Sequence, residues 1–373
     1  MEWKEDVLGN VLEVKYGKDH KKLADGQYPV YGSGGLMRYV DSKLYDGPSI
    51  LIPRKGTLSN IMFVDNPFWT VDTMFWSIIN TDKVDPKFLF YSICKRDFAS
   101  MNVGSAVPSM TVNILNDIQI SYPKNIEDQR RIASILSSLD RKIELNNKIN
   151  ADLEEMAQAI FKNWFVDFEP FKDGKFVDSE LGMIPEGWKV GSPYKYVKVV
   201  YGAPYKSAKF NDNGEGLPLI RIRDLKDCNP QFYTPEILPQ TEYVNMGDIV
   251  AGMDAEFVPH IWKGNTGLLN QRVCKLMPQQ TSISNLFVLY LMKPELEFVQ
   301  SYKTGTTVSH LGKADIDKFV VVLPPLKVVE ECSKILDSIL QRIKNISAES
   351  RNLSTLRDTL LPRLMSGELE VPE

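Results

Sequence analysis

The sequence has few cysteines and histidines, and neither residue type is clustered. Among 373 residues there are four cysteines and three histidines, and no two cysteines form a C-x-x-C pair. Disulfide frameworks and structural zinc sites need such residues at short, repeated spacings. We therefore expect neither kind of site. The residues concerned are Cys94, Cys228, Cys274, Cys332, His20, His260 and His310.

Long apolar runs and an excess of positive charge are also missing. No stretch reaches the roughly 18 apolar residues that a membrane-spanning helix needs, and the first residues, MEWKED, are too charged for a secretory signal. We expect a soluble cytoplasmic protein with no membrane partner. Forty-four Lys and Arg against 48 Asp and Glu give a net charge of −4. This balance excludes binding of nucleic acid by bulk charge alone, so any such surface must be local.

Motifs for catalysis are incomplete. The glycine-rich segment 32–35 is not followed by the Lys-Ser/Thr of a phosphate-binding loop. The segment DNPF at 65–68 resembles the Asn/Asp-Pro-Pro-Tyr/Phe turn of adenine methyltransferases, but Asn66 stands in place of the first proline. No glycine-rich S-adenosylmethionine loop precedes it. We expect no catalytic residue, cofactor or metal in this chain, and a fused adenine methyltransferase remains a minor alternative.

The chain contains an internal repeat. Gly-Ser-Ala-Val at 104–107 recurs as Gly-Thr-Thr-Val at 305–308, and Trp3 near the start has a counterpart in Trp188. Each copy is followed by a long helical pattern. A repeat of this length predicts a duplicated domain and not a solenoid of short units. The predicted domains are 1–123 and 183–324, each followed by a helical region, 124–182 and 325–373.

Each helical region carries a heptad pattern. From Glu127 to about Trp164 there is no proline or glycine, and apolar residues recur at alternating steps of three and four. The second region repeats the pattern, with Pro362 expected to kink or end its helix. The predicted seam residues are Leu136, Leu139, Ile143, Asn150, Leu153 and Ile160 in the first helix, and Leu336, Ile339, Ile343, Ser350, Leu353 and Leu360 in the second.

Two matching seams predict that the helices pair with one another. The second helix can bury its stripe only by returning along the first, so we expect an antiparallel coiled coil. Asn150 and Ser350 lie near the middle of their stripes, which would bring them together as one polar layer that sets the register. The alternative is that each helix buries its stripe on its own globular domain.

The globular segments contain short β-type runs bounded by turn residues. Strands are predicted at 50–52, 61–64, 219–222 and 320–322, and one helix in each copy at 86–96 and 284–292. The predicted fold class is α+β. Two repeated mixed α/β domains would be joined by two long antiparallel helices that form a coiled-coil spacer, with pseudo-two-fold symmetry.

Polar side chains gather on the loops of both globular segments. Arginine and lysine beside glycine and hydroxyl groups suit contacts with phosphates and guanine edges. For any single residue the alternative is a solvated surface charge. The candidate DNA-contacting residues are Tyr31, Ser33, Arg38, Arg54, Lys55, Thr57 and Ser105 in the first copy, and Lys206, Lys209, Arg221, Arg223, Asp254, His260, Lys263, Thr306 and Thr307 in the second.

Several segments resemble a known family, the specificity subunits of Type I restriction-modification enzymes. EDQRRIA at 127–133, LDRKIELNNKIN at 139–150 and FKNWFVDF at 161–168 are similar to the central conserved region of that family. IPEGW at 184–188 is similar to the start of its second target-recognition domain, and LMSGEL at 364–369 to its C-terminal conserved region. The resemblance covers the whole chain.

The resemblance implies a non-catalytic subunit. It would read a bipartite site on double-stranded DNA, position two methyltransferase subunits and recruit restriction (translocase) subunits. S-adenosylmethionine would then belong to the methyltransferase partner, and ATP and magnesium to the restriction partner. Two segments depart from the pattern, VVEEC at 328–332 and the acidic loop DNGE at 212–215. The alternative function is a coiled-coil structural adaptor whose globular domains bind proteins.

Overall fold

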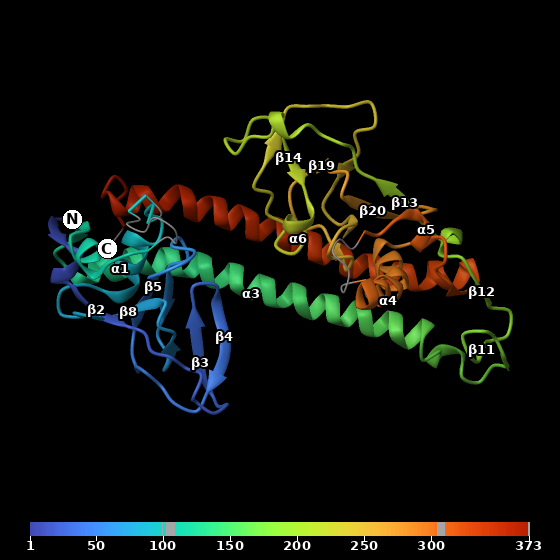
Figure 1. Ribbon diagram of the computed structural model, residues 1–373, viewed down its shortest axis with the longest axis horizontal. Helices are drawn as coiled ribbons and strands as arrows, with labels where there is room; N and C mark the ends of the chain where they lie inside the picture. Colours follow the sequence, from blue (N-terminus) through green and yellow to red (C-terminus); the bar gives the residue numbers. More distant parts are fainter. Residues whose placement is uncertain (99, 102–108, 304–309, 372–373) are drawn as a thin grey trace. The chain divides into compact units, whose positions relative to one another are not determined.

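The computed structural model describes residues 1–98, 100–101, 109–303 and 310–371 (Figure 1). The chain divides into two compact units. The first unit comprises Met1–Ile143 and Asn352–Glu373, and the second comprises Glu144–Arg351. Two 40-residue helices, α3 (Ile126–Phe165) and α6 (Leu326–Met365), each contribute residues to both units.

The first unit is built on two small sheets and a strand pair. A four-stranded antiparallel sheet has the order β2-β8-β5-β6, and a three-stranded sheet has the order β4-β3-β7, in which β3 and β7 are parallel. The strands are β1 (Trp3–Val7), β2 (Leu12–Tyr16), β3 (Tyr28–Gly32), β4 (Gly35–Val40), β5 (Ser49–Pro53), β6 (Met62–Val64), β7 (Trp69–Thr70), β8 (Met74–Ile79) and β9 (Gln119–Pro123), with β1 paired to β9; the helices are α1 (Pro86–Ile93) and α2 (Val112–Asn116).

The second unit repeats this arrangement. Its four-stranded antiparallel sheet has the order β13-β20-β17-β18, and a second sheet, β15-β14-β19-β16, again contains one parallel pair, β14 with β19. The strands are β10 (Phe176–Val177), β11 (Ile184–Pro185), β12 (Lys189–Gly191), β13 (Val197–Tyr201), β14 (Leu217–Ile220), β15 (Tyr233–Thr234), β16 (Tyr243–Val244), β17 (Ile249–Gly252), β18 (Pro259–Ile261), β19 (Gly267–Leu269), β20 (Val273–Pro278) and β21 (Val321–Leu323), with β12 paired to β21; the helices are α4 (Asn285–Lys303) and α5 (Lys313–Ile316).

Matching glycines show how closely the two copies agree. Gly17 follows β2, and a Cβ atom there would lie 2.0 Å from the carbonyl oxygen of Val71. Gly202 follows β13, and its Cβ would lie 2.1 Å from the carbonyl oxygen of Asn270. Neither position can accept a side chain, because the backbone that directly follows another strand, β7 or β19, occupies the space. The predicted duplication is thus confirmed at the level of individual backbone contacts.

The long helices pair antiparallel. In the second unit, the side-chain amide of Asn146 donates to Glu349 at 2.9 Å, and that of Asn150 donates to Ser347 at 3.1 Å. Residue numbers that rise along α3 therefore meet falling numbers along α6. Asn150 and Ser350 line the same pocket, but the hydrogen-bond partner of Asn150 is Ser347, three residues earlier. Ser350 is buried, but its hydroxyl has no hydrogen-bond partner in the described part of the chain.

The seam residues also pack on the globular parts. Pairing of the two helices and packing of each helix on its own globular domain therefore occur together. Leu136, Leu336 and Ile343 are fully buried, the first in the core of the first unit and the other two in that of the second. A helix that lies between a partner helix and a sheet needs a wider apolar stripe than a coiled-coil seam. The remaining seam positions are buried at Ile339 and Leu153, and only half-buried at Leu139, Ile143, Ile160, Leu353 and Leu360.

Several predicted boundaries move. Helix α6 continues through Pro362 to Met365, where Leu364 is 1% exposed, because the burial of this turn outweighs one lost backbone hydrogen bond. Helix α4 extends to Lys303 past Pro294, whereas α1 ends at Ile93 instead of at 96. In the described part of the chain, no helix is long and apolar enough to cross a membrane.

Candidate nucleic-acid interface

In the first unit, two predicted polar segments lie next to each other. The side-chain amide of Asn60 donates to the carbonyl oxygen of Ser33 at 2.8 Å, and a Cβ on Gly56 would lie 3.3 Å from the Ser33 hydroxyl oxygen. Gly56 has φ +89°, a conformation that favours glycine. The glycine-rich turn after β3 and the turn Arg-Lys-Gly-Thr at 54–57 therefore form one surface, which we call the first polar turn.

The side chains of the first polar turn differ in how far other residues hold them in place. Arg54 lies over the ring of Tyr16, 5.3 Å from its centroid, and donates to the carbonyl oxygen of Asp72 at 3.3 Å. Lys55 and Thr57 are exposed. The turn thus holds one arginine in place and presents a lysine and a hydroxyl to solvent, as a surface for phosphates or base edges requires.

Tyr31 and Arg38 are more constrained. Arg38 donates to the carbonyl oxygen of Leu23 at 3.1 Å and pairs with Asp25 at 2.7 Å. Tyr31 is half-buried in β3, and burial raises the pKa of its hydroxyl, so the group is a neutral donor and acceptor at pH 7. An open cavity of about 520 Å³ adjoins them, lined in part by His20, Lys21, Ser33, Met37, Asp72 and Thr73.

In the second unit, the predicted cations are largely paired. Lys209 forms an ion pair with Glu236 at 3.0 Å, and the backbone N–H of Lys206 donates to the same carboxylate at 2.9 Å. The guanidinium of Arg221 lies 4.2 Å from the ring centroid of Phe232. Arg223 is exposed and has the freedom that a DNA contact needs.

Lys263 contacts both long helices, whereas His260 is largely buried in β18. The ammonium group of Lys263 pairs with Glu154 on α3. The backbone carbonyl oxygen of Lys263 accepts a hydrogen bond from Arg351 on α6. His260 has 24% of its side chain exposed, and burial lowers its pKa, so it is mainly neutral at pH 7. The contacts of Lys263 hold the segment after β18 against the two helices. The sequence does not show what faces a side chain, so these contacts could not be predicted, and a DNA contact of either residue stays a prediction.

Two residues beside Asp254 were not among the candidates predicted from the sequence. The carboxylate of Asp254 forms an ion pair with the guanidinium of Arg272 at 3.1 Å and contacts Nδ1 of His310 at 2.7 Å. Arg272 comes just before β20 and His310 just before α5, far from Asp254 in the sequence. Only an alignment of the repeat carried through this turn would have brought the three together. Ser105, Thr306 and Thr307 lie outside the described residues.

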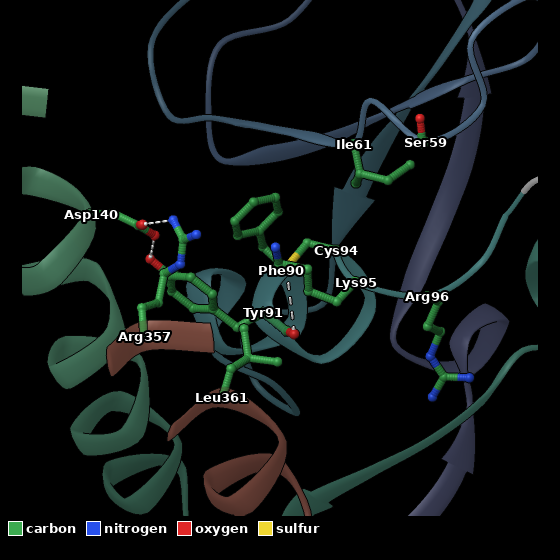
Figure 2. A pocket seen from close by; sticks show the side chains of 10 residues that line it. All are labelled: Ser59, Ile61, Phe90, Tyr91, Cys94, Lys95, Arg96, Asp140, Arg357 and Leu361. Atoms are coloured by element: carbon green, nitrogen blue, oxygen red, sulfur yellow. Dashed lines mark hydrogen bonds and ion pairs between the residues drawn. The ribbon is translucent and has the colours of Figure 1, made fainter. Parts of the chain in front are cut away.

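Figure 2 shows a pocket of about 380 Å³ in the first unit, between α1 and the two long helices. Asp140 on α3 accepts hydrogen bonds from Tyr91 at 2.6 Å and from Arg357 on α6 at 2.7 Å. Burial raises the pKa of the Cys94 thiol to about 11, so it is not a reactive thiolate. The polar groups satisfy one another, which is typical of a structural junction. No group of residues that could hold a metal is found among the described residues.

Comparison with known proteins gives one consistent result. The profile of the family described as "Type I restriction modification DNA specificity domain" matches residues 1–155 and 186–353. The chain is 27% identical to the Type I restriction enzyme MjaIX specificity subunit of Methanocaldococcus jannaschii, over 95% of this chain and 86% of that protein. It is 24% identical to the HindI specificity subunit of Haemophilus influenzae, over 83% of each.

The fold has a counterpart among solved structures. The Type I restriction-modification S subunit from M. genitalium superimposes with a TM-score of 0.57 at 14% sequence identity, over 98% of this chain and 96% of that chain. At this level of identity the likeness concerns the fold. Both copies of the repeat and both long helices lie within the matched length.

Proposed function

Because the chain belongs to the family of Type I restriction-modification DNA specificity subunits, we propose that its two globular parts each read one half of a bipartite DNA site. The observation that carries this proposal is the duplication of one fold with different polar side chains on each copy. Two copies of one fold would present equivalent loops to DNA in the same manner, whereas different side chains on those loops would select different bases.

The long helices would set the distance between the two half-sites. Helix α3 has 40 residues, which at about 1.5 Å per residue give a length of roughly 60 Å. A rod of this size reaches over more than one turn of duplex, since stacked base pairs advance about 3.4 Å each. The half-sites would then be separated by bases that the subunit does not read.

Chemistry would be left to partner subunits. We propose that two methyltransferase subunits, which bind S-adenosylmethionine, and restriction subunits, which use ATP and magnesium, assemble on this chain. The net charge of −4 fits this assembly, because partners that surround the duplex can supply the phosphate contacts that this chain lacks.

The test is methylation mapping. The chain would be assembled with its methyltransferase partner and used to methylate a library of DNA with random sequence. We expect methylated adenines in two short specific sequences separated by a fixed number of unspecified bases. One continuous motif would contradict the bipartite reading. Assembly with protein partners and no dependence on DNA sequence would favour the structural adaptor.

A further inference from the structure

The second unit has a turn that is structurally equivalent to the first polar turn. The N–H of Arg54 donates to the carbonyl oxygen of Thr73 at 2.8 Å, and the N–H of Met253 donates to that of Arg272 at 2.9 Å. Isolated bridges then join Lys55 to Ser109 in the first unit and Asp254 to His310 in the second. The backbone in the two copies thus follows the same path. We call the segment Met-Asp-Ala-Glu at 253–256 the second polar turn.

The side chains at these equivalent positions differ in charge. Lys55 in the first unit corresponds to Asp254 in the second, and the neutral Thr73 corresponds to Arg272. The second unit thus has its cation on the neighbouring strand end and an anion on the turn itself. The backbone is shared, but the positive charge lies on the turn in the first unit and beside the turn in the second. In this way one fold would present a hydrogen-bond donor to a different base.

Burial distinguishes the roles within this group. Asp254 has only 17% of its side chain exposed, whereas Arg272 has 67% and His310 has 61%. Both oxygens of the carboxylate are engaged, Oδ2 by Arg272 at 3.1 Å and Oδ1 by His310 at 2.7 Å. The anion is therefore covered and holds two exposed side chains. Arg272 keeps further N–H groups of its guanidinium for another partner, since one nitrogen makes the contact to Asp254.

We propose that Arg272 reads a guanine in the second half-site and that Asp254 is the residue that positions it. An arginine fork on O6 and N7 of guanine is the commonest specific contact in the major groove. An arginine already held by a carboxylate loses less conformational freedom on binding, which favours its use for specificity. His310, held by the same carboxylate, is the second polar contact of this group. The inference rests on the proposed bipartite reading and adds residues to it.

The experiment measures base preference position by position. Complexes that carry Arg272→Ala, Arg272→Lys, Asp254→Ala or the double substitution would methylate the random library. We expect Arg272→Ala to lower the preference for one guanine of one half-site by roughly 5- to 150-fold, and to leave the other half-site unchanged. Arg272→Lys keeps the charge but not the fork, so the same position should relax.

The double substitution separates positioning from an independent role. If Asp254 acts through Arg272, the double variant is no worse than Arg272→Ala at that base pair. Multiplied effects would show that Asp254 makes a contact of its own and would overturn its positioning role. Lys313→Ala is the matched control, because it removes an exposed lysine of the same unit that pairs with Asp317 at 2.8 Å. We expect no change of base preference from it.

Failure of the proposed function and failure of the inference on Arg272 give different results. A wild-type complex without a bipartite motif contradicts the proposed function before any variant is considered. A bipartite wild-type motif that Arg272→Ala leaves intact at every position overturns this inference alone. Thermal melting of the two Arg272 variants near that of the wild type, as expected for a side chain that is 67% exposed, shows that lost preference is not caused by unfolding.

Discussion

The two units of this protein share the order of one four-stranded sheet, a parallel strand pair in the other sheet and the same close glycine contacts, but they differ in how they attach to the long helices. In the first unit, attachment includes the polar junction of Tyr91, Asp140 and Arg357. In the second unit, it includes an aromatic cluster, with Phe287 centred 5.7 Å from Phe161 and 5.2 Å from Phe165, beside the ion pair of Lys263 with Glu154. The sheets tolerate either kind of attachment because their own strands supply the framework.

The polar turns make the same point at the surface. Two equal backbones carry a lysine in one copy and an aspartate in the other. Buried contacts that hold the fold and exposed side chains that select a ligand therefore vary separately. The following predictions test this separation, beginning with the change of largest expected effect.

Exchange of residues 1–123 for the matching segment of a related specificity subunit should replace one half of the methylated sequence and leave the other half unaltered. The reason is that, among the described residues, the strands of each sheet pair only with strands of the same unit. Methylation mapping of the chimera measures the result. A change in both halves would show that the two copies read DNA jointly.

Insertion of a full heptad after Asn147, with a matched heptad after Glu349 on the facing helix, should widen the gap between half-sites by about three base pairs. Seven residues add about 10 Å and preserve the heptad pattern. The control is Ala-Glu-Ala-Lys at the same two places, which adds about 6 Å and breaks the pattern, so recognition should be impaired. Methylation at the original spacing by the heptad variant would mean that the helices do not set the distance.

Leu136→Ala and Leu336→Ala should each lower the free energy of unfolding by about 2–5 kcal/mol, because both side chains are fully buried. Leu139→Ala is the matched control on the same helix and should cost less, since Leu139 is half-buried. Urea denaturation compares the three variants. Equal losses at Leu136 and Leu139 would indicate that the coiled-coil seam, and not the packing on the sheets, dominates stability.

Lys55→Ala should reduce discrimination or affinity in the first half-site only, by about 1–3 kcal/mol if the lysine contacts a base. A uniform loss over all DNA sequences, with a weaker dependence on salt, would instead identify a phosphate contact. Binding to a panel of single-base variants at two salt concentrations distinguishes these results. Lys15→Ala is the control, as its ammonium is paired with Glu13 on β2.

Tyr91→Phe and Tyr290→Phe should each cost about 1 kcal/mol of stability, because each variant loses one hydrogen bond to α3. Tyr91 donates to the side chain of Asp140 at 2.6 Å, and Tyr290 donates to the carbonyl oxygen of Glu154 at 2.7 Å. Thermal denaturation measures both. A much larger loss at Tyr91 would show that the polar junction in Figure 2 is stronger than the sum of its bonds.

Much of the fold could be predicted because it depends on periodic patterns. Heptad spacing located α3 and α6, and a short apolar run located β5 at Ser49–Pro53. The register of the helices could not be predicted, since Asn150 has polar residues at both Ser347 and Ser350 as possible partners. Which one it contacts depends on how each helix packs on its sheet.

The candidate interface was less predictable than the fold. Arg54 and Lys55 were found because they adjoin in the sequence, next to a buried strand. Arg272 and His310 were missed because the group exists only where two distant segments meet Asp254. Lys263, by contrast, is of a residue type that often contacts DNA, but its side chain pairs with Glu154 on α3.

By itself, the sequence determined the duplication, the two long helices, their antiparallel pairing and the family, because these depend on spacing and on runs of residues. Only the tertiary structure decided which cations are exposed, which are paired and which polar side chains meet. The physical reason is that the partner of a charge is chosen by distance in space, and strands and loops far apart in the chain supply that partner.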